Sequence, residues 1–171
     1  QGKEAGGHRA TVLSSEEEGA RYTTEALLQQ ALVLTDKPII AAGGIGTTAT
    51  ALSLIRQGAR AVQIGTAFLL AKEAGTKLAH KKALIEMKNR KTQLTRAFSG
   101  RLARTIKNQF AEKYSAVAPS LYPEIHCLTA PLRAAANKKG NAEYLNLWAG
   151  ENFAEAQEGS AAEIVERFTP Y

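Results

Sequence analysis

The sequence predicts an α/β fold with parallel strands, and three observations support this prediction. The composition, with 44% hydrophobic and 22% charged residues in a chain of 171, is typical of a soluble globular domain. Two short apolar runs end in glycine, as buried parallel strands do, and each follows a segment with apolar residues at helical spacing. Parallel strands need a crossover connection, which is usually a helix, so this alternation indicates βα units.

The first helix and strand are expected between residues 24 and 42. Thr23 or Thr24 can cap the helix, which extends over residues 24–35. Its apolar residues recur at helical spacing: Leu27, Leu28, Ala31, Leu32 and Leu34. Asp36, Lys37 and Pro38 then end the helix, and the apolar run 39–42 before Gly43 and Gly44 predicts a fully buried parallel strand.

A second helix and strand follow directly. The helix begins at 46–48, places Ala51, Leu52 and Ile55 on one face, and ends at Gly58. The run 61–64 then predicts a second strand, which Gly65 ends.

The chain after Phe68 is predicted to be mainly helical. Residues 78–87 and 102–114 have helical patterns, and 95–100 between them is either extended or looped. Beyond Pro119 the chain is rich in alanine and predicted helical, with breaks at four residues: Pro123, Pro131, Gly140 and Gly150.

The turns after the two strands, 41–46 and 63–66, are candidates for binding a phosphate. Glycines let the backbone approach an anion closely, the N–H groups that open a helix point at it, and Thr66 adds a hydroxyl donor. In βα barrels, the loops after the last two strands commonly hold such a group. For each turn taken alone, a purely structural reason for its glycines is as good as phosphate binding, because tight loops need glycine whether or not they bind a ligand.

A third glycine-rich loop, 4–8, ends in His8. A histidine after two flexible glycines can lie over the ring of a cofactor and titrate near neutral pH, although the spacing alone favours a surface histidine bonded to backbone. His80 is predicted to be solvated, and His126 is left unassigned. The single cysteine, Cys127, excludes an internal disulfide and is expected to be a small buried hydrophobe.

Charge and hydropathy argue against nucleic-acid and membrane partners. The net charge is +6, and the segment 77–113 contains most of the excess, but it has almost no aromatic residue for base stacking and is interpreted as a solvated helix face. No stretch is long and apolar enough for a spanning helix. We therefore expect a cytoplasmic protein.

Several segments together resemble the nitronate monooxygenases, formerly called 2-nitropropane dioxygenases. They occur in the same order and at matching spacing: 1–8, 38–45, 58–66, 95–104, 128–136 and 147–150. The resemblance covers nearly the whole chain. It implies the C-terminal part of a TIM (β/α)8 barrel, with the last βα units in 1–75 and a mainly helical segment in 76–171 that packs on the barrel or completes it.

The resemblance also implies a cofactor and a reaction. FMN would be contacted on its flavin side by Gln1 and Gly6, and at its phosphate end by Gly44 and by Gln63, Ile64, Gly65 and Thr66. His8 corresponds to the family's base, which would remove the α-proton of a neutral nitroalkane or hydrogen-bond the nitro group of a nitronate. The implied activity is the oxidation of a small anionic alkyl nitronate by O2 to a carbonyl compound and nitrite.

Two alternatives remain at this stage. An FMN-dependent enoyl reductase that uses NAD(P)H would share the glycine loops and the histidine, although the motifs at 98–101 and 147–150 favour nitronate oxidation. The other is a catalytically incomplete fragment, because the chain begins with Gln1 and a full barrel needs about 250 residues. We expect an N-terminal half to complete the barrel, and oligomeric state is left open.

Overall fold

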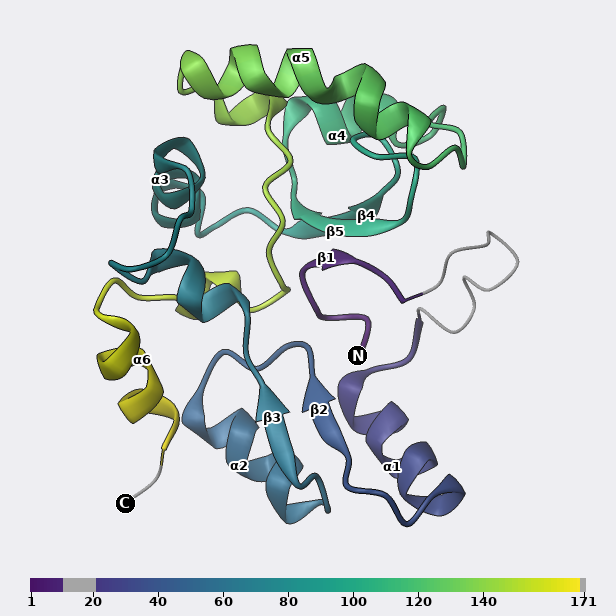
Figure 1. Cartoon of the computed structure of the whole chain (residues 1–171), viewed down its shortest axis with the longest axis vertical. Coiled ribbons are helices and arrows are strands. Elements are labelled where there is room, and N and C mark those ends of the chain that lie inside the picture. The colour runs from purple at the N-terminus through teal and green to yellow at the C-terminus, as the bar shows by residue number, and fades with distance from the viewer. Residues whose placement is uncertain (11–20, 170–171) are drawn as a thin grey trace.

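The computed structural model describes residues 1–10 and 21–169. Its lower part in Figure 1 contains a pair of parallel strands, β2 (Ile40–Ala42) and β3 (Ala61–Gln63), with helices α1 (Thr24–Leu34) and α2 (Thr48–Arg56). Ile40 pairs with Ala61, and Ala42 with Gln63. The predicted βα repeat is therefore confirmed, and the two strands end side by side.

Local capping explains where the two helices begin. The Thr23 side chain accepts a hydrogen bond from the amide of Ala26, and the Thr47 side chain accepts one from the amide of Thr50. Gly58 follows α2 in a left-handed conformation, with φ of 108°.

The prediction of a fully buried first strand was wrong in one respect. Ala41 is buried, but Ile40 is 61% exposed. The two-stranded sheet packs against α1 and α2, and nothing in the described part of the chain covers Ile40.

The upper part of the molecule contains a three-stranded antiparallel sheet that the sequence did not predict. Its order is β1 (Gly7–His8), β5 (Ala103–Ile106) and β4 (Thr92–Thr95). Helices α4 (Gln109–Tyr114) and α5 (Glu124–Lys138) lie over it (Figure 1). The predicted helix over 102–114 was therefore wrong in its first half, because all four residues of β5 are buried and pair with β4, and Ala103 and Arg104 also pair with β1.

The other described elements pack beside these two parts. They are the 3-10 turns at Thr66–Leu70, Ala142–Tyr144 and Phe153–Glu155, helix α3 (Leu78–Glu86) and helix α6 (Ala161–Phe168). One hydrophobic core includes Leu70, Leu84, Ile106, Leu147 and Phe153, and so joins segments distant in sequence.

Pro131 does not break the chain's longest helix, contrary to prediction. It lies inside α5 on the exposed side, where solvent can bind the carbonyl that the proline ring leaves without an N–H donor. Gly140, with φ of 65°, follows the helix end as expected.

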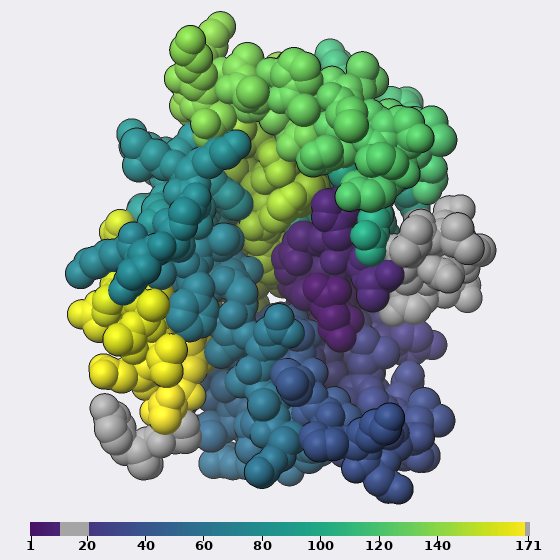
Figure 2. Space-filling view, viewed as in Figure 1, coloured from purple at the N-terminus to yellow at the C-terminus, as the bar shows by residue number. Residues whose placement is uncertain are grey.

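The N-terminal residues lie in the middle of the face shown in Figure 2, between α5 above and the β2–β3 unit below. The amide of Gly2 donates to the carbonyl of Ala42, and β1 pairs with β5, so this short segment contacts both parts of the fold. No helix in residues 1–10 and 21–169 is long and apolar enough to cross a membrane.

Candidate functional site

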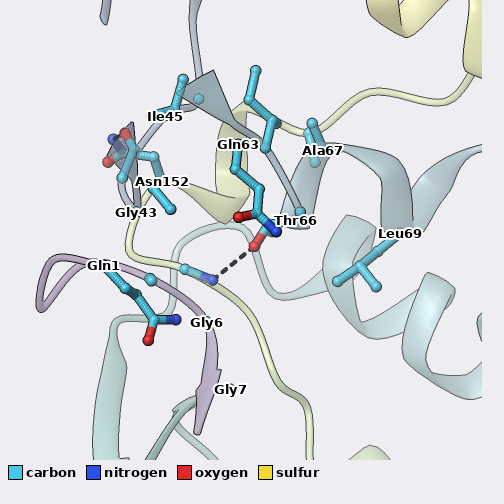
Figure 3. A pocket seen from close by; sticks show the side chains of 18 of the residues that line it. Gln1, Gly6, Gly7, Gly43, Ile45, Gln63, Thr66, Ala67, Leu69 and Asn152 are labelled. Atoms are coloured by element: carbon cyan, nitrogen blue, oxygen red, sulfur yellow. Dashed lines mark hydrogen bonds between the residues drawn. The ribbon is translucent and has the colours of Figure 1, made fainter. Parts of the chain in front are cut away.

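A cavity of about 560 Å³ opens where the N-terminal loop meets the ends of β2 and β3 (Figure 3). We call it the glycine-lined cavity. All seven residues predicted to hold a cofactor line it: Gln1, Gly6, Gly44, Gln63, Ile64, Gly65 and Thr66. The turns at Gly44 and Gly65 thus face one space, as expected when two parallel strands end at the same edge of a sheet.

The two turns need glycine for different reasons. Gly44 has φ of 69°, and a Cβ on it would lie 2.9 Å from the Cβ of Glu4, so the turn approaches the N-terminal loop too closely for a side chain. Gly65 has an ordinary φ of −112°, and no heavy atom lies within 4 Å of the position that its Cβ would occupy. No packing within the described chain requires glycine at 65.

Residues of the segment after β5 complete the wall of the cavity. The hydroxyl oxygen of Thr66 accepts a hydrogen bond of 3.0 Å from the amide of Gly150, drawn as the dashed line in Figure 3. The side-chain amide of Asn152 donates to the carbonyl of Gly44 at 2.5 Å. Asn152 was not predicted, since it lies far from both turns in sequence and in no recognisable motif.

The buried arginine Arg9, 3% exposed, holds the N-terminal loop in shape. Its guanidinium donates hydrogen bonds to four loop carbonyls: Gly2 at 2.9 Å, Lys3 at 3.1 Å, Gly7 at 3.1 Å, and Ala5. Burial is the main cause that lowers the pKa of Arg9 to about 10, which leaves it charged at neutral pH. No pattern in the sequence indicates this role for Arg9.

Arg104 of β5 fixes the same loop from the other side. Its Nε donates to the carbonyl of Lys3 at 2.7 Å, and its Nη2 forms an ion pair of 2.9 Å with Glu151. The Glu151 amide in turn donates to the carbonyl of Glu4. The interpretation of 77–113 as a solvated helix face was therefore wrong for Arg104, which is buried in a sheet.

His8 lies beside the glycine-lined cavity, next to Gly7 and Trp148, which line it. The His8 ring centroid is 5.3 Å from that of Trp148 and 6.0 Å from that of Tyr122. Its Nε2 lies 2.8 Å from the hydroxyl oxygen of Ser99. Burial, and next the positive charge of Arg101, lower the pKa of His8 below its usual 6.5.

The other histidine and cysteine predictions need correction. His80 is largely buried instead of solvated, and burial lowers its pKa to about 4. His126 is exposed and contacts Arg133. Cys127 is exposed, because it lies on the outer side of α5. In residues 1–10 and 21–169, no group of histidine, cysteine and acidic side chains could hold a metal ion.

Similarity to known proteins shows the family to which this chain belongs. The family model for nitronate monooxygenase matches residues 1–170. The chain belongs to the nitronate monooxygenase family. A probable nitronate monooxygenase from Staphylococcus aureus strain Newman is 38% identical over 154 residues, which are 89% of this chain and 43% of that protein. The counterpart from strain USA300 matches equally well.

Two solved structures resemble the fold closely. A nitroalkane oxidase from Streptomyces ansochromogenes is 44% identical, with a TM-score of 0.93 over 98% of this chain and 49% of that one. FabK from Thermotoga maritima is 25% identical, with a TM-score of 0.76 over 98% of this chain and 51% of that one. The chain spans about half the length of the relatives that it matches, in agreement with the expected partial TIM barrel.

Proposed function

We propose that this chain supplies the FMN site and the base of an enzyme that oxidises alkyl nitronates with O2 to carbonyl compounds and nitrite. Family membership and the similarity to a nitroalkane oxidase support the reaction class. The observation that carries the proposal is the convergence of Gly44, Gly65 and Gly6 on one cavity, with His8 at its margin.

The residues present fit a flavin phosphate. Among the described residues that line the glycine-lined cavity, none has a carboxylate that would repel an anion. Its volume of about 560 Å³ lies within the usual range of roughly 300–1,000 Å³ for ligand sites. The backbone at Gly44, Gly65 and Thr66 would hold the phosphate, and Gln1 and Gly6 would contact the flavin side.

FMN, when bound, supplies the redox chemistry. His8 supplies the base. The Ser99 hydroxyl donates to the carbonyl of Arg101 at 3.1 Å, so it accepts from Nε2–H of His8, and Nδ1 keeps the lone pair. The lowered pKa of His8 keeps this nitrogen unprotonated at neutral pH, ready to remove the α-proton of a nitroalkane.

The positive charges near His8 suit an anionic substrate. Arg101 and Arg9 both act on the His8 ring electrostatically, and both are held by backbone carbonyls. A nitronate that approaches the ring would be stabilised by this potential, while Trp148 and Tyr122 limit the access of water.

An assay under air decides between the proposed reaction and its alternative. The chain, alone and together with the N-terminal half of a full-length relative, is given FMN and an alkyl nitronate, and nitrite release is measured. We expect nitrite only when both halves are present, because this chain spans about half of its relatives. The same mixtures are given NADPH in a separate assay, and its oxidation is measured. NADPH oxidation together with no nitrite release from the nitronate would favour the enoyl reductase alternative and contradict the proposal.

A further inference from the structure

A second cavity, of about 670 Å³, lies between α3 and α5 beside the segment 145–148, which runs between the upper and lower parts in Figure 1. It shares Leu69 and Trp148 with the glycine-lined cavity and is otherwise distinct from it. We call it the basic cavity, because the chargeable side chains among its described lining residues are all basic: Lys77, His80, His126 and Arg133.

Arg133 is fixed in position before any ligand binds. Its Nε donates to the Thr129 hydroxyl at 3.2 Å, and its Nη2 donates to the carbonyl of His126 at 2.8 Å. Thr129 is itself anchored, since its hydroxyl donates to the carbonyl of Phe98 at 2.6 Å. These partners are neutral, so they orient the guanidinium without neutralising its charge.

His80 adds an unsatisfied polar atom in the same cavity. The backbone carbonyl of Trp148 hydrogen-bonds its ring, yet Nε2 is buried and has no hydrogen-bond partner among the described residues. Because the ring N–H donates to the Trp148 carbonyl, Nε2 carries a lone pair and is an acceptor. A buried acceptor without a partner costs free energy, which only an N–H or O–H donor could recover, so His80 does not itself bind the negative charge of a ligand.

The remaining walls are apolar or neutral. Leu69, Leu145, Ala130 and the ring of Trp148 offer hydrophobic contact, and Asn137 and Asn146 offer amides. A ligand that fits combines one negative charge with a short apolar body.

We infer that the basic cavity binds a small organic carboxylate, with its charged group on Arg133 and its apolar part against Trp148. This inference concerns a site that is separate from the proposed FMN site. It holds or fails whether or not the chain binds FMN.

Butyrate and its neutral counterpart butyramide test the inference on the whole chain. The chain has three histidines, so the ring C–H signals of His80 and His126 can be resolved by NMR during a titration. We expect saturable shifts of these signals with butyrate and none with butyramide. Equal responses to both compounds, or none to butyrate, would overturn the inference.

Matched variants locate the site. Arg133→Met should weaken butyrate binding by about tenfold or more, because a charged hydrogen bond is lost. Lys138→Met removes the same charge from an exposed position on the same helix and should change binding by less than about twofold. Should Arg133→Met fail to fold, Arg133→Gln is used, which also removes the charge and should also weaken binding. Equal effects of the Arg133 substitution and of Lys138→Met on butyrate binding would contradict the inference.

Discussion

Replacing Gly65 by alanine separates the binding of a ligand from the stability of the chain. The new methyl group would point into open space, since no protein atom lies within 4 Å of it and the φ of −112° suits any residue. It would, however, occupy the space in which the proposed phosphate approaches the backbone. Loss of one charge-assisted hydrogen bond, about 1.5–3 kcal/mol, should weaken FMN binding by about 10- to 150-fold.

FMN fluorescence, titrated against the variant and the parent chain, measures this loss, and urea unfolding measures stability. The free energy of unfolding of Gly65→Ala should stay within about 1 kcal/mol of the parent. Gly75→Ala is the matched control, because Gly75 also has no atom within 4 Å of its Cβ position but lies outside the glycine-lined cavity. Unchanged FMN affinity in Gly65→Ala would refute the reasoning.

Three further substitutions test the supports of the site. Arg9→Lys keeps the charge but cannot bind four carbonyls, so urea unfolding should show a free energy of unfolding about 2–4 kcal/mol lower than that of the parent. An unchanged free energy of unfolding would show that the N-terminal loop is stable without these hydrogen bonds. Gly6→Ala puts a methyl 2.6 Å from the backbone of Ala149 and should lower the free energy of unfolding by about 1–3 kcal/mol in the same assay. Gly75→Ala, whose methyl meets no atom within 4 Å, should lower it little. Burial contributes most to the low pKa of His8 and Arg101 contributes next, so Arg101→Leu should raise that pKa toward 6.5; an NMR titration that shows no rise would contradict this.

The two glycine turns could be predicted because their information is local. An apolar run that ends in glycine specifies both the strand and the turn, so the positions of Gly44 and Gly65 followed from adjacent residues. Because β2 and β3 pair in parallel, the turns that follow them lie at the same edge of the sheet.

Only part of the antiparallel sheet depends on pairing between residues distant in sequence. His8 of β1 pairs with Ala103, and Thr105 bridges to Trp148, so no local pattern indicates these contacts. Strands β4 and β5 are close in sequence and pair from Thr95 with Ala103 to Thr92 with Ile106. The segment around Arg104 has apolar and basic residues that also fit a helix, and tertiary pairing overrides that preference.

The role of Arg9 was missed for a similar reason. An arginine after a histidine is usually exposed, and only the folded loop shows four carbonyls turned toward it.

A comparison of FMN with riboflavin, which lacks only the phosphate, tests the central claim most directly. Trp148 is the single tryptophan and lines the glycine-lined cavity, so quenching of its fluorescence reports flavin binding there. The backbone turns at Gly44 and Gly65 should make FMN bind at least about 100-fold more tightly than riboflavin, through at least two charge-assisted hydrogen bonds. Equal affinities for the two flavins would contradict the account.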